Sequence, residues 1–350
     1  MRFAIIGAGM IAEFHARAIR AMPGAELAAV YARRDEAARD FAARHDCCAF
    51  SDLDALLADP GIDIVTICTP SGAHLEPVEA AARAGKHVIC EKPLEVTSER
   101  VDRMIEACQA AGVTLAGIFP RRFNAATRLL KKALDDGRFG RIALADAQVK
   151  WWRPQAYYDS GAWRGTWDLD GGGALMNQSI HTVDLLLHLM GDVASLNAET
   201  RLVAHQGIEV EDTAVALLAF SSGALGTIQG STACWSATGH PAEIQICGEK
   251  GSVFMTDDRF RVWEFADESP ADARIRGEFG VDATAAGAGA ADPAAIDFMW
   301  HQKNFEDVVA AIRSGHAPAI DGREARRAVH LIEAVYRSAR NGGRKERLSG

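Results

Sequence analysis

Lys92 is the first residue whose type and surroundings suit catalysis. It stands in the run Cys90-Glu91-Lys92-Pro93-Leu94, directly after a short apolar stretch of β type. If that stretch is a strand of a parallel sheet, Lys92 lies at the edge where open α/β sheets bind ligands. There a lysine either hydrogen-bonds a reacting oxygen as a cation or, with a lowered pKa, moves a proton. Taken alone, such a lysine is more often a surface charge.

His181 is the second candidate. It follows a glycine-rich run and lies four residues after Asn177, so the two side chains share one face of the predicted helix. An imidazole takes and gives protons near neutral pH, which suits acid–base catalysis. An isolated histidine on an amphipathic helix more often has a structural role. No second histidine or cysteine stands at zinc-ligand spacing, so we predict no metal site.

The glycine pattern G-x-G-x-x-A follows the first apolar run, residues 3–6. Gly7 allows a tight turn, Gly9 lets the backbone approach a pyrophosphate, and Ala12 is small enough for close helix–strand packing. A helix beginning here would offer a phosphate its positive dipole end and the N–H groups of Met10 and Ile11. The pattern therefore predicts a dinucleotide site, and a glycine turn without a ligand is the alternative.

The residues after the second apolar run bear on the choice of cofactor. In this kind of fold an acidic residue there binds the ribose 2′-hydroxyl of NAD, and an arginine accommodates the 2′-phosphate of NADP. The chain has Ala32 followed by Arg33 and Arg34, which favours NADP over NAD. The alternative is that both arginines are solvated residues at a helix start and that Asp35 serves NAD.

These candidates belong to alternating strands and helices. Apolar runs of β type and helical repeats follow one another from residue 3 to residue 118. The predicted strands are 3–6, 27–31, 62–68, 87–90 and 113–118, and the predicted helices follow residue 10 and cover 37–45, 77–84 and 98–111. Such alternation predicts an α/β fold with a parallel sheet covered by helices on both faces.

Composition excludes several function classes. With 38 Lys+Arg against 47 Asp+Glu, the formal net charge is -9, which disfavours nucleic acid and anionic membranes as partners. No apolar stretch reaches the roughly 18 to 20 residues of a membrane-spanning helix. The 7 cysteines show neither zinc spacing nor a small disulfide framework, so we expect reduced thiols in a cytoplasmic protein.

Five motifs, in order, resemble the GFO/IDH/MocA family, which is named for glucose–fructose oxidoreductase, inositol dehydrogenase and a rhizopine-catabolism protein. They are GAGMIA near the start, TPSGAH over 69–74, EKP over 91–93, RRF over 121–123 and GGGALMNQSIHTVDLL from residue 171. The resemblance covers nearly the whole chain. It implies a Rossmann domain over 1–121. Over 122–350 it implies an α/β domain with a large, mostly antiparallel open sheet, which covers the substrate and commonly builds homodimers or homotetramers.

Residues from about 123 onward fit this second domain. We expect a helix through Leu129-Leu130 and strands at 142–149, 213–220, 224–230, 243–247 and 260–265. The stretch 266–293 is rich in Ala, Gly and acids and lacks periodicity, which predicts an exposed loop, serving as a lid or subunit contact, or disorder. Helices near 302–314 and 322–340 close the chain.

The resemblance also implies roles residue by residue. Lys92 would lie beside the nicotinamide and the reacting oxygen, and His181 would transfer the proton. Many dehydrogenases of the family have aspartate where this chain has Asn177, whose amide holds a hydroxyl or orients the imidazole but carries no proton. Further cofactor contacts are expected from Thr69, Pro70, His74 and Glu91. Substrate contacts are expected from Lys92, Asn177, His181, Arg122, Tyr158, Trp163, Arg164 and Thr182.

The function implied is that of an NAD(P)-dependent dehydrogenase that moves a hydride between nicotinamide and a secondary hydroxyl or ketone of a sugar, inositol or sugar acid. The aromatic-rich segment 151–167 fits a sugar site or, equally, an ordinary interdomain core. Two other functions stay open. One is a redox-neutral, NAD-dependent glycoside hydrolase or lyase, and the other is a non-catalytic, dinucleotide-binding sensor.

Overall fold

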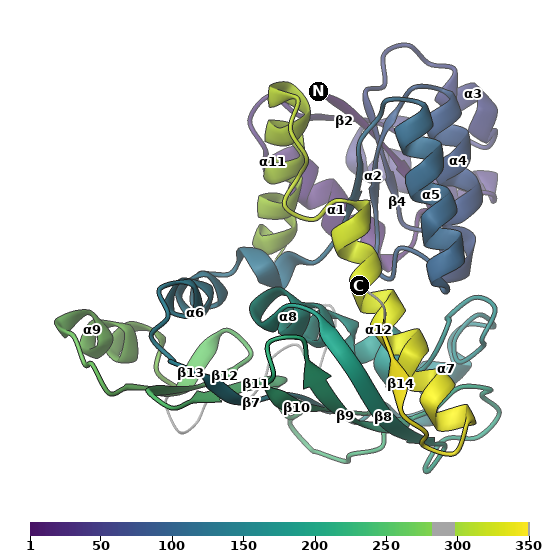
Figure 1. Cartoon of the computed structure of the whole chain (residues 1–350). Helices are drawn as coiled ribbons and strands as arrows, with labels where there is room; N and C mark the ends of the chain where they lie inside the picture. The colour runs from purple at the N-terminus through teal and green to yellow at the C-terminus, as the bar shows by residue number, and fades with distance from the viewer. Residues whose placement is uncertain (282–297, 349–350) are drawn as a thin grey trace. The chain divides into compact units, whose positions relative to one another are not determined.

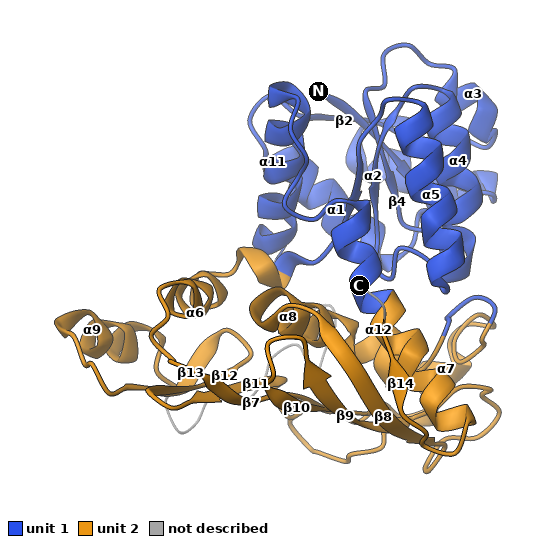
Figure 2. Cartoon of the chain, in the orientation of Figure 1, with its two compact units in different colours: residues 1–120, 168–171, 297–329 blue, residues 121–167, 172–296, 330–350 orange. Residues whose placement is uncertain are grey.

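The computed structural model describes residues 1–281 and 298–348. It forms two compact units, coloured blue and orange in Figure 2. Unit 1 comprises residues 1–120, 168–171 and 297–329, and unit 2 comprises residues 121–167, 172–296 and 330–350. Each unit is described by itself.

Unit 1 is built on a six-stranded sheet in the order β3-β2-β1-β4-β5-β6, with every pair parallel. This confirms the predicted doubly wound α/β fold. Because the strand order reverses between β1 and β4, the carboxyl edge of these strands forms the crevice where such sheets bind ligands. The strands are β1 (Arg2–Ile6), β2 (Glu26–Tyr31), β3 (Cys48–Phe50), β4 (Ile64–Ile67), β5 (His87–Cys90) and β6 (Leu115–Gly117).

The helices of unit 1 lie along this sheet, and Figure 1 shows α4 and α5 side by side. They are α1 (Met10–Ala21), α2 (Asp35–His45), α3 (Leu53–Leu57), α4 (Leu75–Arg83), α5 (Ser98–Ala110) and α11 (Met299–Ser314), with a 3-10 turn η1 (Ser71–Ala73). The predicted boundary placed α11 in the second domain, but α11 packs on α1 in unit 1. Phe305 of α11 is fully buried, with its ring 5.9 Å from that of Phe3.

Unit 2 contains an eight-stranded sheet in the order β13-β12-β11-β7-β10-β9-β8-β14. Only β7 and β10 pair in parallel among the described strands of this sheet, so the predicted, mostly antiparallel sheet is confirmed. One face is buried through alternate residues such as Ala216 and Leu218. The strands are β7 (Ile142–Lys150), β8 (Val193–Arg201), β9 (Thr213–Phe220), β10 (Leu225–Ser231), β11 (Glu243–Gly248), β12 (Gly251–Thr256), β13 (Arg259–Phe265) and β14 (Glu346–Arg347).

Unit 2 also holds α6 (Ala125–Asp135), α7 (Gln155–Asp159), η3 (Ala174–Ser179), α8 (Ile180–Met190) and α9 (Pro270–Phe279), together with all of η2 (Pro120–Phe123) except its first residue. The last helix, α12 (Gly322–Arg340), has its first residues in unit 1 and its residues from 330 onward in unit 2.

Helix α9 corrects the loop that the sequence predicted over 266–293. Its position is fixed by polar contacts rather than by an apolar stripe. Asp272 caps the start of the helix at Ser269, accepts a hydrogen bond of 2.7 Å from the Trp263 indole and pairs with Arg138. The remainder of that predicted loop, residues 282–293, lies outside the described residues.

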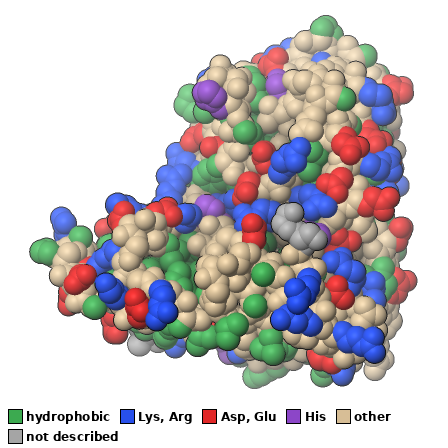
Figure 3. Space-filling view, in the orientation of Figure 1, with side chains coloured by type: hydrophobic (Ala, Val, Ile, Leu, Met, Phe, Trp, Pro, Cys, Tyr) green, Lys and Arg blue, Asp and Glu red, His purple; other side chains and the backbone are tan. Residues whose placement is uncertain are grey.

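Charged side chains of both signs are interspersed on the face shown in Figure 3. This pattern agrees with the low net charge per residue of the sequence. Among the residues that the structure describes, no helix is both long and apolar enough to cross a membrane.

Candidate active site

The glycine loop stands at the carboxyl end of β1. Gly7 has a φ of 105°, and a Cβ there would lie 2.7 Å from the Cys68 carbonyl oxygen, so the turn requires glycine. Gly9 is the N-cap of α1, and a Cβ on it would meet no described atom within 4 Å. Within the described chain no side chain caps this helix. The N–H groups at Met10 and Ile11 therefore fit the pyrophosphate of a dinucleotide.

The residues predicted to determine the selectivity between NAD and NADP lie at the carboxyl end of β2. Ala32 is buried, whereas Arg33 and Arg34 are exposed. Arg34 is the N-cap of α2, and Asp35 is the first residue of that helix. Two cationic side chains and one carboxylate are thus available where a dinucleotide fold places the adenosine ribose.

The loop after β4 contains Thr69, Pro70 and His74. The Thr69 hydroxyl donates to the Ala73 carbonyl oxygen at 2.9 Å. The His74 ring lies between carbonyl oxygens, with Nε2 2.9 Å from that of Thr69 and Nδ1 3.0 Å from that of Pro93. Because His74 is 1% exposed, it ties this loop to the segment after β5 and leaves little surface for the predicted cofactor contact.

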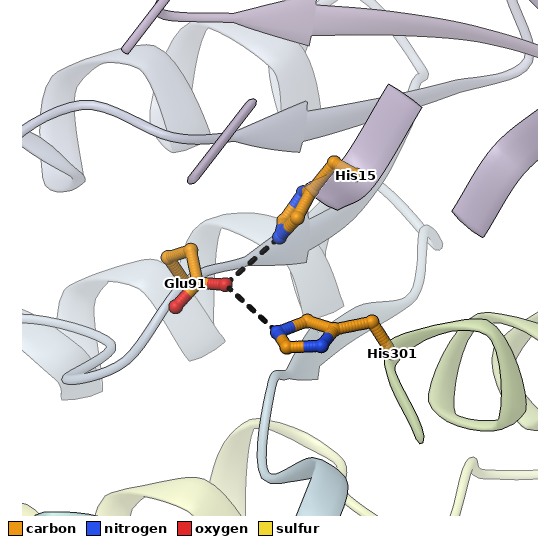
Figure 4. A group of neighbouring side chains, drawn as sticks. All are labelled: His15, Glu91 and His301. Carbon is orange, nitrogen blue, oxygen red and sulfur yellow. Dashed lines mark hydrogen bonds and ion pairs between the residues drawn. The ribbon is translucent and has the colours of Figure 1, made fainter. Parts of the chain in front are cut away.

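Glu91 and Lys92 follow β5 directly. The Glu91 carboxylate accepts a hydrogen bond of 2.8 Å from His15 Nε2 and another of 3.0 Å from the Lys92 backbone N–H. His301 Nε2 lies 4.0 Å from the same carboxylate oxygen as His15 (Figure 4). Burial raises the pKa of Glu91, but the hydrogen bond from His15 and the charges of His15, His301 and Lys92 outweigh it and lower the pKa to about 2.

The buried partners of Glu91 were not predicted from the sequence. His15 lies on the inner face of α1, and its Nδ1 is 2.7 Å from the Thr66 hydroxyl oxygen on β4. His301 is contributed by α11, more than two hundred residues away in the chain. The sequence offered one indication of His15, namely its position six residues after Gly9, on the helix that follows the glycine loop. No local pattern indicated His301.

Asn177 and His181 lie on consecutive helices of unit 2. The predicted regular α-helix begins instead with one π-helical segment, η3, which contains Asn177, and His181 is the second residue of α8. Both residues are half-buried. Such π segments occur often at functional sites because they change which side chains a helix presents together.

The start of η3 is fixed by Glu211. Its carboxylate accepts hydrogen bonds from the N–H groups of Gly173 and Leu175 at 3.0 and 2.8 Å and from the Tyr336 hydroxyl at 2.9 Å. A Cβ on Gly173 would lie 1.9 Å from the Glu211 carbonyl oxygen, so this approach requires glycine. Burial raises the pKa of Glu211 to about 7 despite these three donors. These contacts therefore fix the backbone at the first residues of η3, the helix that carries Asn177.

A chain of hydrogen bonds runs from Asn177 through Gln178 to one tyrosine and two arginine side chains. The Gln178 amide N–H donates to Asn177 Oδ1 at 2.6 Å and to the Tyr157 hydroxyl at 2.8 Å. Arg153 Nε donates to Gln178 Oε1 at 3.0 Å. Arg164 donates to the same Tyr157 hydroxyl at 2.6 Å. The structure thus brings Asn177 and the predicted Arg164 into one network, in which Arg153, Tyr157 and Gln178 were not predicted.

Aromatic rings surround the two arginines of this network. The Arg164 guanidinium lies over the Tyr157 and Trp163 rings, 4.2 and 4.5 Å from their centroids. Tyr158 was predicted to contact the substrate, but it is 5% exposed and its hydroxyl pairs with that of Thr232 at 2.8 Å. The neighbouring Tyr157 lies on the other side of α7, where its hydroxyl accepts a hydrogen bond from Gln178, whereas Tyr158 is buried.

Two further residues that were predicted to bind substrate, Arg122 and Thr182, instead bind other side chains of unit 2. Arg122 is buried and forms a two-point ion pair with Asp184, with N–O distances of 2.9 and 2.6 Å. Thr182 is 2% exposed, and its hydroxyl accepts a hydrogen bond from Arg121 at 3.1 Å. Both residues therefore stabilise the packing of α8 against η2, and the predicted direct contacts with substrate are not supported.

Two family models match the chain. One, described as an oxidoreductase family with an NAD-binding Rossmann fold, matches residues 1–119, and the other, the GFO/IDH/MocA C-terminal domain, matches residues 127–254. The chain belongs to the GFO/IDH/MocA family of oxidoreductases. The predicted family is thereby confirmed, and the glycine loop described above belongs to an NAD-binding domain.

Several GFO/IDH/MocA proteins are similar over most of their length. The WlbA dehydrogenase from Bordetella pertussis, in complex with NADH and UDP-GlcNAcA, is 36% identical with a TM-score of 0.88 and covers 100% of this chain and 99% of its own. The WlbA dehydrogenase from Chromobacterium violaceum, with the same two ligands, is 35% identical with a TM-score of 0.89, at 100% and 96% coverage. Myo-inositol 2-dehydrogenase from Thermotoga maritima is 32% identical, covering 77% of this chain and 79% of its own.

Proposed function

We propose that the protein is an NAD-dependent dehydrogenase that oxidises a secondary hydroxyl of a sugar acid carried on a nucleoside diphosphate. The observation that carries this proposal is the network around Asn177, in which two arginines stand among aromatic rings. Guanidinium groups suit carboxylates and phosphates, and flat rings suit the apolar face of a sugar or a base. Similarity to two dehydrogenases whose structures hold NADH and UDP-GlcNAcA supports the same class.

The proposed mechanism assigns one task to each polar residue. NAD, when bound, accepts or returns a hydride. The His181 imidazole takes the hydroxyl proton during oxidation and returns it during reduction. The Lys92 ammonium stabilises the negative charge that develops on the substrate oxygen. Asn177 holds a substrate hydroxyl through its amide but, unlike an aspartate, adds no negative charge beside the imidazole.

Replacing Arg164 tests the acidic nature of the substrate. Because a glutamine has no charge, we expect Arg164→Gln to raise the KM for UDP-GlcNAcA about 10-fold or more, while the KM for UDP-GlcNAc, whose sugar has no carboxylate, changes little. Steady-state kinetics with both compounds provides the measurement. The control is Arg340→Gln, which removes an arginine from the Trp167 ring of the same unit. Equal effects on both substrates would contradict the assignment.

The exposed arginines after β2 lead to a proposal about the cofactor. Similarity to NADH complexes supports NAD, and we further propose that Arg33 and Arg34 let the enzyme accept NADP. Replacing both arginines by alanine should raise the KM for NADP about 10-fold or more without a comparable change for NAD, because only NADP carries the 2′-phosphate. Kinetics with each cofactor checks this. An unchanged ratio of the two KM values would show that the arginines are solvated residues.

The open face of the unit 2 sheet supports a homo-oligomer. Four large apolar side chains on adjacent strands are roughly half or more exposed, namely Leu144, Val215, Leu217 and Leu225. An apolar patch of this kind marks an interaction surface. We expect Leu217→Glu combined with Leu225→Glu to dissociate a dimer or tetramer into monomers, whereas Val203→Glu, outside the sheet, should leave the oligomer intact. Light scattering gives the molar mass of each variant. A monomeric wild-type protein would overturn the proposal.

A further inference from the structure

His15, Glu91 and His301 form a buried cluster in unit 1 that the proposed mechanism does not use. They come from α1, from the end of β5 and from α11, and their side chains are 0%, 7% and 8% exposed. Figure 4 shows both imidazoles directed at one oxygen of the Glu91 carboxylate. The ligand atoms of the three residues all lie within 4.8 Å of one another. Such a cluster either holds a metal ion or has an internal structural task.

The distances favour hydrogen bonding over metal coordination. His15 Nε2 and Glu91 Oε1 are 2.8 Å apart. Two ligand atoms on a tetrahedral zinc ion with bonds of about 2.0 to 2.2 Å would lie about 3.3 Å apart. Because a carboxylate only accepts, His15 Nε2 is the donor of this hydrogen bond. The other ring nitrogen is held by the Thr66 hydroxyl at 2.7 Å and the Cys68 thiol at 3.2 Å.

The consequence of this arrangement reaches Lys92. One oxygen of the Glu91 carboxylate is held by His15, and the other accepts the Lys92 backbone N–H at 3.0 Å. The charge of Lys92 also acts on the cluster, since it contributes to lowering the pKa values of Glu91 and His301. The backbone of Lys92 is therefore fixed through a carboxylate whose own orientation depends on His15.

We propose that His15 is a positioning residue for Lys92, because it fixes the Glu91 carboxylate that in turn holds the Lys92 peptide. The catalytic part of this inference rests on the proposed function, in which the Lys92 ammonium meets the substrate oxygen. A lysine displaced by about 1 Å would still permit cofactor binding but would slow the chemical step. His15 thus acts on turnover without touching substrate.

Two variants of His15 separate positioning from simple stability. His15→Leu removes the hydrogen-bond donor, and His15→Gln keeps an N–H at a similar reach. We expect His15→Leu to lower kcat about 10- to 100-fold with the NADH Kd changed little, and His15→Gln to recover most of the loss. The matched control is His45→Leu, which removes another histidine–carboxylate contact of 2.7 Å to Glu13, on the same helix as His15.

Amide hydrogen exchange at Lys92 provides a readout that does not require activity. The wild-type protein, His15→Gln and His45→Leu should protect this N–H, and His15→Leu should lose protection by about 10-fold or more. If no sugar compound is oxidised by the wild-type protein, the proposed function fails while the exchange data still decide the positioning. Unchanged exchange and unchanged kcat in His15→Leu would overturn the inference. The inference would also be overturned if the purified protein held one zinc ion per chain, and if removing that zinc with a chelator abolished the protection of the Lys92 N–H.

Discussion

Replacing His181 by alanine should lower kcat for the oxidation of UDP-GlcNAcA about 10²- to 10⁴-fold, because the hydroxyl proton then has no base to receive it. The NADH Kd should change little, since the residues expected to hold NAD belong to unit 1. Rapid-mixing kinetics and fluorescence titration with NADH give the two quantities.

Added imidazole is the matched control for this variant. It should restore part of the turnover of His181→Ala, because a small base can enter the space left by the side chain, and it should leave the wild-type rate unchanged. Turnover near the wild-type value in His181→Ala, with or without imidazole, would remove His181 from the mechanism.

Replacing Lys92 by methionine should lower kcat about 10²- to 10³-fold, the usual cost of removing a donor that stabilises a developing oxyanion. Methionine keeps much of the length and loses the charge, so packing beside Glu91 is largely preserved. Lys92→Arg keeps the charge on a differently shaped group and should recover only a part of the rate. Steady-state kinetics at saturating substrate provides the comparison.

Lys86→Met is the control for Lys92→Met. Lys86 precedes the first residue of β5, whereas Lys92 follows its last, so the two lie at opposite ends of one strand. The Lys86 ammonium donates to the backbone carbonyls of Asp59 and Ile62. Its loss should lower the melting temperature and leave kcat nearly unchanged. If kcat fell equally in Lys86→Met and Lys92→Met, the effect of replacing Lys92 would be a loss of stability rather than of catalysis.

The fold of unit 1 could be predicted because its apolar runs are long enough to show their period. Five of the six strands were expected near their observed positions, while β3 (Cys48–Phe50) and α3 (Leu53–Leu57) are too short to give a pattern. In unit 2, β8 was missed because polar residues such as Asn197 interrupt its apolar run. β12 was missed because its apolar run, residues 253–255, is only three residues long. The return of α11 to unit 1 depends on contacts of Phe305 that no local pattern reveals.

The candidate site was predicted where a local motif specified it. Lys92, Asn177 and His181 stand in motifs, and the glycine loop has the backbone conformation that its pattern required. The direction of side chains on a short helix such as α7 depends on tertiary packing. The sequence therefore predicted a substrate contact for Tyr158, whereas in the structure Tyr157 faces Gln178. Arg122 resembled a substrate residue because its partner, Asp184, lies sixty-two positions away.

The most direct test of the proposed function is the formation of reduced nicotinamide when the purified protein is mixed with NAD and UDP-GlcNAcA. Scyllo- and myo-inositol, and UDP-GlcNAc, whose sugar has no carboxylate, serve as parallel substrates. The proposal predicts a rise in reduced-nicotinamide absorbance with the acidic nucleotide sugar, and a rate that falls in both His181→Ala and Lys92→Met. A protein that binds NADH but cleaves or hydrates its substrate with no net change in that absorbance would contradict it.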